Sequence, residues 1–501
     1  MTIKQTGSRT VAPKPRHQPQ PQPQPGLLRR GVPSSAIVWL ASICGFMTVM
    51  DTSIVNVALP AMRVALRLSS ADQQWVVDAY LLTLGGFMLL GSRAGDIYGR
   101  RRILAIGIVV FVLGSLTGGL AQNAMMLLIA RAVQGLGGAI LSPVGMALII
   151  ASIPDGPARG KALTIYQSAS QIAVIIGVVL GGLLVQLISW RWVMFINVPV
   201  GIGLFIAVLL LLSPDPRRRS GERLDIAGAV TVTIAVAALI EGFATAQRHS
   251  WGSPSTIAFL IGGALLVAVF IVIETRVAQP LVRLNIFRLP GIAPGFLILA
   301  LNGTVLTAST LFVSLILQSD LGNGALISGV ALTPFVLSSV IAGFASMQLM
   351  HRFQARHLIA VGLAIAAIGY GWLGMLGAHP SYAANILGPL IVTGIGLGFA
   401  VIATTRAATA AVTPQDAGLA SGLFSLARQL GAAIGIAALV TLAATQTSSY
   451  FAAHATRGAA TAALRGDAVA LLACGGLCLL SALIALLLPK PSPKPRPVSA
   501  Q

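Results

Sequence analysis

The sequence predicts an all-α integral membrane protein in which fourteen transmembrane helices form two six-helix halves with a two-helix insertion. Three observations predict this fold class. The 501 residues are 56% hydrophobic and only 9% charged, whereas about a quarter of the residues of a soluble domain are charged. Apolar stretches long enough to cross a bilayer recur along the chain. The first six and the last six of these stretches share a pattern of small residues.

The first 35 residues predict a disordered cytoplasmic tail, 1–35. They contain a Pro-Gln repeat from Pro19 to Pro25 and six Lys or Arg residues. Such a segment buries too little apolar surface to fold, and its prolines favour an extended chain. No cleavable signal peptide is evident, so we expect the first apolar span to act as an uncleaved signal anchor.

Fourteen apolar stretches have the length of a transmembrane helix, because a bilayer core about 30 Å thick requires roughly 20 residues. The predicted N-terminal half, 36–213, contains spans at 37–60, 73–92, 103–121, 125–151, 162–187 and 193–212. The predicted segment 214–290 contains a cytoplasmic linker and the two inserted helices, the seventh and eighth, at 225–244 and 255–274. The predicted C-terminal half, 291–489, contains spans at 292–317, 325–349, 358–377, 383–405, 419–441 and 467–488, and a second cytoplasmic tail covers 490–501.

The distribution of lysine and arginine predicts the orientation. With a cytoplasmic N-terminus, 25 of the 33 Lys and Arg residues fall on the cytoplasmic side and six on the outer side. Because basic loops stay in the cytoplasm, this bias predicts that both termini are cytoplasmic. The net charge of +20 is thus an orientation signal, and we expect a lipid bilayer and no nucleic acid as partner. The excess of arginine over lysine suggests a bacterium with a GC-rich genome.

An internal repeat relates the two predicted halves. The fifth and thirteenth spans match at one constant offset, with Gly160, Ala162, Ala169, Gln171 and Gly177 corresponding to Gly418, Ala420, Ala427, Gln429 and Gly435. In the fourth and twelfth spans, Gly135, Leu136, Gly137 and Ala139 correspond to Gly396, Leu397, Gly398 and Ala400. Chance similarity between Gly- and Ala-rich helices is the alternative. Repeated halves are typical of transporters that expose one site alternately to two sides.

The sequence contains no pattern that indicates an enzyme. It lacks a GxxxxGK[ST] phosphate-binding loop and an HExxH metal site. All six histidines fall in the tail or in predicted loops. The three cysteines, Cys44, Cys474 and Cys478, lie inside apolar stretches and form neither a disulfide framework nor a CxxC site. We therefore expect no catalytic residue, no bound metal and no cofactor.

Three charged residues lie within the spans of the first half. From the spacing, Asp51, Asp78 and Arg131 lie about 14, 9 and 12 Å below the outer surface, at a rise of ~1.5 Å per residue. Ionisable groups in the bilayer are costly and usually serve function. A carboxylate gains proton affinity on burial and loses it beside a guanidinium. Movement of Arg131 relative to Asp51 or Asp78 would therefore load and unload a proton; a static ion pair is the alternative.

Other polar residues are candidates for the wall of a substrate cavity. These are Asn56, Gln134 and Arg428, although Asn56 and Arg428 could instead serve helix packing. Glu241 is expected near the outer end of the seventh span, in contact with water. The cavity is expected to bind hydrophobic small molecules, whose identity the sequence does not specify.

Four motifs carry a resemblance to a known family. Residues 50–60 read MDTSIVNVALP and resemble the first-helix signature of the fourteen-helix drug:proton antiporter family of the major facilitator superfamily. Residues 91–102 read GSRAGDIYGRRR and resemble the superfamily's loop between helices 2 and 3. Residues 131–138, RAVQGLGG, are similar to its fourth-helix motif. Residues 190–199, WRWVMFINVP, resemble the connection between its fifth and sixth helices.

The resemblance implies an exporter driven by the proton gradient across a bacterial inner membrane. Hydrophobic or amphipathic drugs, antibiotics or dyes would leave by alternating access, and the protein would act as a monomer. A lipid or metabolite exporter or flippase on the same fold is the alternative, and a membrane sensor would need a signalling domain. The family assigns proton coupling to Asp51 and Arg131. It assigns conformational switching to the loop residues Gly91, Gly95, Asp96, Gly99, Arg100 and Arg101, where Asp96 is expected to cap a neighbouring helix.

The fifth span departs from the family's antiporter motif, which reads Gly-Pro-x-x-Gly-Gly. Here Val178 follows Gly177, and Gly181 and Gly182 complete the pattern. The glycines permit close helix packing, but valine cannot kink the helix as proline does. Because the kink is missing, the fifth span does not itself predict strict proton antiport.

Overall fold

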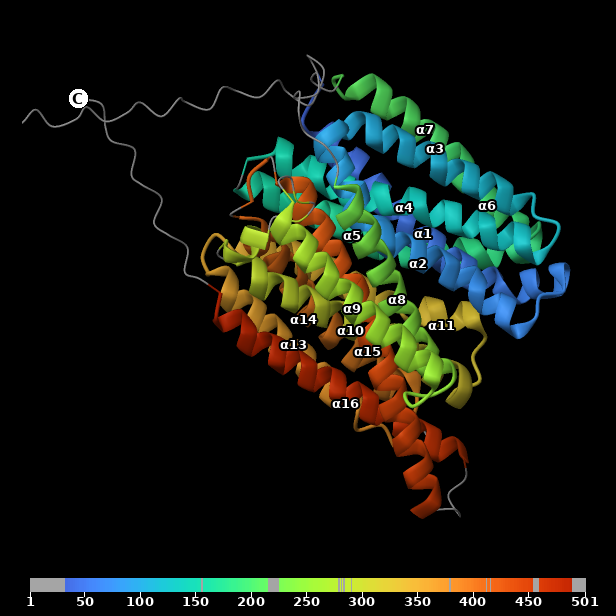
Figure 1. Cartoon of the computed structure of the whole chain (residues 1–501). Coiled ribbons are helices and arrows are strands. Elements are labelled where there is room, and N and C mark those ends of the chain that lie inside the picture. The colour runs from blue at the N-terminus through green and yellow to red at the C-terminus, as the bar shows by residue number, and fades with distance from the viewer. Residues whose placement is uncertain are drawn as a thin grey trace, which may run out of the picture.

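The computed structural model describes residues 32–154, 156–214, 225–277, 280, 282, 284–289, 291–377, 380–410, 412–414, 416–453 and 459–488. Both predicted tails, apart from a few residues that adjoin the bundle, and most of the linker after the sixth span lie outside the described residues. The described part of the chain contains fourteen helices that are long and apolar enough to cross a membrane, as predicted. Figure 1 shows them as one bundle with a common long axis.

The first half contains α1 (Ser35–Leu66), α2 (Ser70–Tyr98), α3 (Arg100–Gly119), α4 (Ala124–Ser152), α5 (Pro157–Leu187), α6 (Arg191–Phe195) and α7 (Asn197–Leu211), and α6 with α7 makes the sixth span. The inserted pair is α8 (Ile226–Arg248) and α9 (Pro254–Arg276), followed by a short helix, η1 (Leu284–Arg288). The second half contains α10 (Ile292–Leu315), η2 (Ile316–Asp320), α11 (Ala325–Ala331), α12 (Thr333–Leu349), α13 (Ala355–Leu373), η3 (Tyr382–Ile386), α14 (Leu387–Thr409), α15 (Ala417–Ala453) and α16 (Ala459–Leu486).

Local sequence fixes several helix starts. Ser69 and Asp72 form a capping box at the start of α2, where each side chain binds the backbone N–H of the other residue. Asn123 accepts a hydrogen bond from the backbone N–H of Met126 and caps α4. Such caps satisfy N–H groups that have no partner within the helix. The predicted starts of these spans are therefore close to the observed ones.

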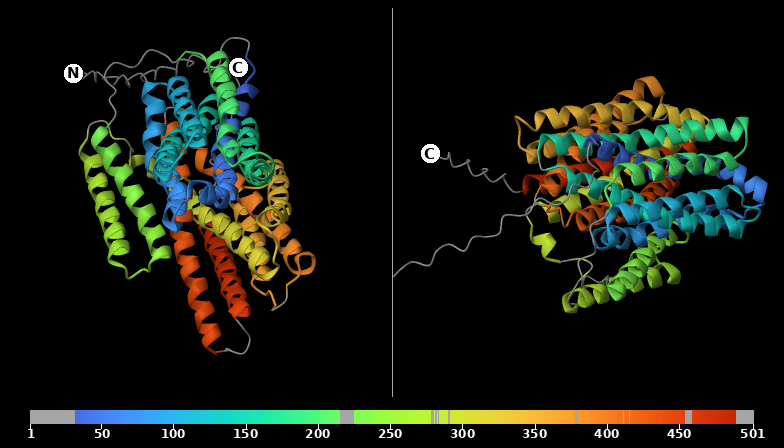
Figure 2. Two further views of the ribbon diagram at one scale, coloured as in Figure 1. Left: turned by 90° about the vertical axis from the view of Figure 1, so that its right-hand side faces the viewer. Right: turned by 90° about the horizontal axis from the view of Figure 1, so that it is seen from above.

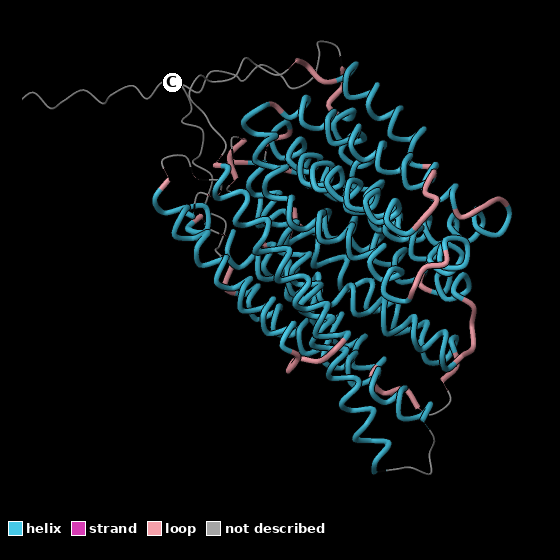
Figure 3. Tube along the Cα trace, turned by 45° about the vertical axis from the view of Figure 1, so that its right-hand side comes forward, coloured by secondary structure: helices cyan, strands magenta, loops and turns pink. Residues whose placement is uncertain are grey.

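Helices α15 and α16 differ most from their predicted bounds. Helix α15 ends at Ala453, although the apolar stretch ends near residue 441, and α16 begins at Ala459 instead of residue 467. Their outer ends form a hairpin that projects beyond the neighbouring helices (Figures 1 and 3). Gly466 permits close packing there, because a Cβ atom at this position would meet Thr447 on α15. Hydropathy did not reveal these additional helical turns of α15 and α16, because a helix that extends beyond the bilayer needs no continuous apolar surface.

The two halves repeat the same helix pairings. In the first half α1 packs on α5 and α4 packs on α2 and α3; in the second half α10 packs on α15 and α14 packs on α12 and α13. The equivalent residues of α4 and α14 differ from the predicted ones. Gly135 approaches α2 as Gly394 approaches α12, and Gly137 approaches α3 as Gly396 approaches α13. Structurally equivalent residues of α4 and α14 are thus 259 positions apart in the chain, whereas the sequence match predicted 261. The structure identifies the equivalent glycines by the helix that each one contacts.

The inserted helices lie outside the two halves. Helices α8 and α9 pack on each other, and α8 also packs on α2 and α15. Figure 2 shows the pair at the periphery of the bundle, next to helices of both halves. Helix α8 therefore covers the line along which α2 of the first half meets α15 of the second.

Candidate functional site

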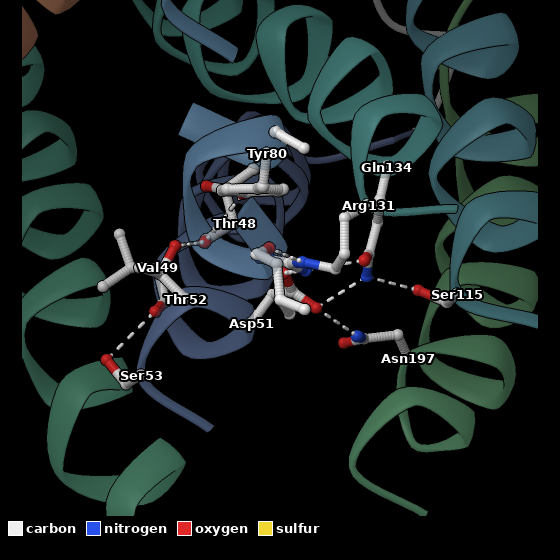
Figure 4. A network of polar contacts seen from close by, with 12 residues as sticks. Thr48, Val49, Asp51, Thr52, Ser53, Tyr80, Ser115, Arg131, Gln134 and Asn197 are labelled. Carbon is white, nitrogen blue, oxygen red and sulfur yellow. Dashed lines mark hydrogen bonds and ion pairs between the residues drawn. The ribbon is translucent and has the colours of Figure 1, made fainter. Parts of the chain in front are cut away.

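A buried polar network surrounds Asp51 on α1 (Figure 4). Its Oδ2 accepts a hydrogen bond from Arg131 Nη1 at 2.6 Å, and its Oδ1 accepts one from Gln134 Nε2 at 2.6 Å. Asn197 on α7 also donates to Oδ1, at 2.8 Å. The side chains of Asp51 and Arg131 are 0% and 1% exposed. The ion pair of Asp51 and Arg131 thus lies inside the first half, out of contact with solvent.

The Arg131 guanidinium is held by several groups besides Asp51. Its Nε donates to the carbonyl oxygen of Val76 at 3.0 Å, and its Nη1 also donates to Gln134 Oε1 at 2.7 Å. The guanidinium carbon lies 4.3 Å from the centre of the Tyr80 ring, a cation–π geometry. A buried arginine requires such a set of partners, because removing a charge from water is costly.

Two members of this network were not predicted. Asn197 begins α7, and Ser115 on α3 accepts a hydrogen bond from Gln134 Nε2 at 2.7 Å. Asn197 falls within the motif at 190–199, but the motif does not indicate which group its amide binds. The network therefore joins five helices of one half, α1, α2, α3, α4 and α7.

The partners of Asp51 suit an ionised carboxylate. Arg131, Gln134 and Asn197 all donate hydrogen bonds to it, and an ionised carboxylate only accepts. A proton on Asp51 would add a donor where donors already converge, and it would remove the charge that Arg131 opposes.

A cavity of about 810 Å³ lies between the two halves. Helices α1, α2, α4 and α5 line it from one half, α10, α12, α14 and α15 from the other, and α8 contributes from the insertion. Aliphatic side chains alternate on its wall with hydroxyl and amide groups. Pockets for drug-sized molecules have about this volume and combine apolar walls with a few polar groups.

The predicted site residues divide between the network and the cavity. Asp78, Asn56 and Arg428 line the cavity. Gln134 was expected there, but it is fully buried and bound to Asp51. Residues 48, 49, 52 and 53 of α1 line the cavity while Asp51 faces α4, so the α1 backbone separates the ion pair from the cavity. The structure thus brings Asp51 and Arg131 together and places Asp78 in the cavity.

Two further polar residues line the cavity without having been predicted to do so. Asn302 on α10 is 5% exposed, and neither its amide nitrogen nor its amide oxygen has a hydrogen-bond partner among the described residues. Glu241 on α8 was expected to contact water near the end of its helix, but it is 9% exposed and faces the cavity. Both positions depend on how helices from different parts of the chain pack, which hydropathy does not reveal.

The loop between α2 and α3 connects the two halves on the predicted cytoplasmic side. Asp96 accepts hydrogen bonds from Arg100, at 2.7 Å, and from the backbone N–H of Leu419 in the first turn of α15, at 3.2 Å. Arg100 also donates to the carbonyl oxygen of Pro414 at 2.9 Å. The carboxylate therefore lies at the positive end of the α15 dipole, a favourable arrangement.

The glycines of this loop serve different purposes. Gly99 has a φ of +99°, which L-residues with a side chain rarely adopt, and it allows α3 to start directly after α2. Gly91 approaches the backbone of α4 at Ala139, and Gly95 approaches Val144. Arg101 binds within the first half, where it donates to the carbonyl oxygen of Leu209 on α7, at 2.9 Å.

Two more hydrogen bonds join the halves on the same side. Ser421 on α15 donates to the carbonyl oxygen of Pro143 at 2.8 Å, and Arg159 on α5 donates to that of Thr409 at 3.2 Å. Together with the contacts of Asp96 and Arg100, they hold the predicted cytoplasmic ends of the halves together. The structure is therefore closed on that side of the cavity.

Helix α5 packs against α1 through its glycines and crosses to the second half at Val178. Cβ atoms at Gly177 and Gly181 would lie about 3 Å from backbone atoms of α1, and Gly182 is buried. Val178, which replaces the motif proline, packs against Gly329 on α11. The helix is continuous from Pro157 to Leu187. The glycines thus keep their packing role without a proline in the helix.

Fourteen spans, a repeated pair of six-helix halves and a cavity between them define a polytopic membrane transporter. The family model of the major facilitator superfamily matches residues 41–436 and 295–501. This chain belongs to the major facilitator superfamily, which confirms the predicted family.

Relatives and solved structures agree with this assignment. A cephamycin export protein of Amycolatopsis lactamdurans is 39% identical over 82% of this chain and 85% of that protein. A puromycin resistance protein of Streptomyces alboniger is 35% identical over 88% of each chain. Among solved structures, the human organic anion transporter MFSD10 superposes with a TM-score of 0.62 at 12% identity, over 90% of this chain and 99% of that one. The proton:xylose symporter XylE gives 0.61 at 14% identity, over 90% and 95%.

Proposed function

We propose that this protein exports hydrophobic or amphipathic small molecules across a bacterial inner membrane, in exchange for protons. The observation that carries the proposal is the buried ion pair of Asp51 and Arg131, separated by α1 from a drug-sized cavity between the halves. Relatives named for the export of cephamycin and for resistance to puromycin and lincomycin support the substrate class. The protein would act as a monomer, with the proton gradient as its energy source and no cofactor.

In the proposed mechanism, Asp51 takes up a proton while the cavity faces outward, the state in which the cytoplasmic ends are closed. Loss of the carboxylate charge would weaken the bond between Asp51 and Arg131. The guanidinium would then move away from Asp51, held by its existing contacts with the carbonyl of Val76 and the ring of Tyr80. Because the network joins α1, α2, α3, α4 and α7, this shift would be transmitted to the faces of α1, α2 and α4 that line the cavity. Return to the ionised form on the cytoplasmic side would release the proton and reset the pair.

Ethidium efflux from energised cells tests the proposal. Cells expressing the wild type, Asp51→Asn, Asp72→Asn or no transporter would be compared at matched expression, with and without a protonophore. Asp72 lies in a capping box at the start of α2, outside the network, so its variant controls for loss of a carboxylate. We expect efflux from the wild type and Asp72→Asn, its collapse with protonophore, and its loss in Asp51→Asn.

Other outcomes would contradict parts of the proposal. Protonophore-insensitive efflux would exclude proton coupling, and normal efflux by Asp51→Asn would exclude Asp51 as the coupling site. Wild-type efflux equal to that of cells without transporter, for ethidium and for a panel of neutral and anionic dyes, would contradict drug export and favour the lipid or metabolite alternative.

A further inference from the structure

The inserted helix α8 packs on a glycine surface of the first half, formed by Gly85 and Gly86 of α2. Gly85 and Gly86 on α2 present no side chains toward it. A Cβ atom at Gly85 would lie 2.6 Å from Ile240 Cδ1, and one at Gly86 would lie 3.2 Å from the carbonyl oxygen of Thr233. Such glycine surfaces allow two helices in a membrane to approach closely. Helix α8 is therefore packed into α2 rather than loosely attached to the bundle.

The outer end of α8 is bound to the second half. In the turn after α8, Trp251 donates a hydrogen bond from its indole nitrogen to Thr441 Oγ1 on α15, at 2.6 Å. The Trp251 ring also makes an edge contact with Phe243 of α8, with ring centres 6.2 Å apart. The insertion is thus held by α2 on one side of the cavity and by α15 on the other.

This position places a carboxylate in the cavity wall. Ile240, Glu241 and Ala244 of α8 line the cavity, and Glu241 Oε1 accepts a hydrogen bond from Thr245 at 3.2 Å. Glu241 is buried to about nine-tenths of its surface, so its charge is weakly screened by water. A buried carboxylate on a cavity wall is stabilised by a cation that enters the cavity beside it.

The charges on the cavity wall favour a cation overall. Among the described residues that line the cavity, Asp78 and Glu241 are acidic and Arg428 is basic, which gives an excess of one negative charge when all three are ionised. We propose that α8 is a wall of the substrate site, and that Glu241 selects substrates that carry a positive charge on a bulky apolar body. The proposal rests on the proposed export function and assigns a role in recognition to the inserted helices.

Binding of a matched pair of probes tests this inference. The purified full-length protein would be titrated calorimetrically with tetraphenylphosphonium, a lipophilic cation, and with triphenylphosphine oxide, a neutral molecule of similar chemistry. The variants are Glu241→Gln, Glu241→Asp and Glu274→Gln. Glu274 is a buried carboxylate on α9 of the same inserted pair, but it does not line the cavity, so its variant is the matched control.

We expect Glu241→Gln to raise the Kd for tetraphenylphosphonium about thirtyfold or more, as the loss of a buried charged partner does, and to leave the Kd for triphenylphosphine oxide unchanged. Glu241→Asp and Glu274→Gln should bind the cation like the wild type. Equal affinity of wild type and Glu241→Gln for the cation, or an equal loss for both probes, would overturn the role of Glu241 while leaving export intact. If the wild type binds neither probe, both this inference and the proposed substrate class fail.

Discussion

Asn302 shows at the scale of one residue how a binding site can conflict with stability. Both polar atoms of its amide are buried at the cavity wall without a hydrogen-bond partner in the part of the chain that the structure describes. An unpaired buried polar group destabilises the folded state by about 1–3 kcal/mol. A substrate with a donor and an acceptor of its own would satisfy this amide. The residue would therefore lower the stability of the protein without substrate and add to the affinity for such a substrate.

This conflict predicts opposite effects of Asn302→Leu on stability and on binding. The variant keeps the branching of the side chain and removes the unpaired amide, and the adjoining cavity has room for the larger methyl groups. The melting temperature should therefore rise, by an amount equivalent to about 1 kcal/mol. The Kd for ethidium, whose amino groups can hydrogen-bond to this amide, should rise in parallel. Thr307→Val on the same helix is the control, because the Thr307 hydroxyl already donates to Gly303 at 2.9 Å. Asn302 would have no such role if its variant were less stable and bound ethidium normally.

The sequence could identify the charged pair but not its surroundings. Asp51 and Arg131 are predictable, since charged residues are rare within apolar spans. Asn197 and Asn302 are not, because uncharged polar residues are common in spans and their partners depend on tertiary packing. Gln134 was placed in the cavity because its motif gives no information about which face of α4 it occupies. The depth of a residue follows from its position in the chain, but the direction of its side chain does not.

At the scale of helices, the insertion of α8 depends on two adjacent glycines of α2. Leucine at Gly86 would place its side chain against the backbone of Thr233, at a position where even a Cβ atom is 3.2 Å from the carbonyl oxygen. Overpacking of this kind costs about 1–3 kcal/mol. Because α8 forms part of the cavity wall, we expect its displacement to change substrate binding as well.

Gly86→Leu should therefore reduce ethidium efflux and increase hydrogen exchange in α8, measured by mass spectrometry on the purified protein. Gly262→Leu on α9 serves as the control, because a Cβ atom there would meet nothing within 4 Å. Unchanged hydrogen exchange in α8 would show that the packing of α8 on α2 does not depend on Gly86. Reduced efflux in the control variant would show that the inserted pair tolerates no added bulk at all.

Helix bounds were predictable where the apolar stretch and the helix end together. Helices α2 and α4 begin within a few residues of their predicted starts, at recognisable caps. Helix α15 continues for twelve residues past its predicted end at residue 441. That extension contains Gln446, Ser448 and Ser449, which have the polarity of a loop, and its helical form follows from pairing with α16.

At the scale of the whole molecule, the hydrogen bonds between the halves define one end state of transport. Asp96 binds the start of α15, Arg100 binds Pro414 in the loop before it, and Ser421 of α15 binds α4. Alternating access requires these contacts to break whenever the cavity opens to the cytoplasm. A covalent bond at the same place should therefore hold the protein in the closed form.

A disulfide between cysteines at positions 92 and 422 would make this bond. A Cβ atom at Gly422 would lie 3.0 Å from the Cβ atom of Ser92, close to the separation of about 3.5–4.5 Å in disulfides. Oxidised Ser92→Cys/Gly422→Cys should lose ethidium efflux, and reduction with dithiothreitol should restore it. Each single variant should be insensitive to oxidation, because the three native cysteines are buried. Full transport by the cross-linked protein would show that this interface does not open.

The projecting hairpin of α15 and α16 has a consequence for imaging. Electron cryo-microscopy of small membrane proteins is limited by particle alignment, because a detergent micelle hides a molecule that has no mass outside it. The last twelve residues of α15 extend about 18 Å at 1.5 Å per residue, and they are paired with the first turns of α16 (Figure 3). Two continuous helices could carry a fused rigid domain or an antibody fragment without a flexible joint. The hairpin thus offers an alignment marker on the side of the molecule opposite to the contacts that must open during transport.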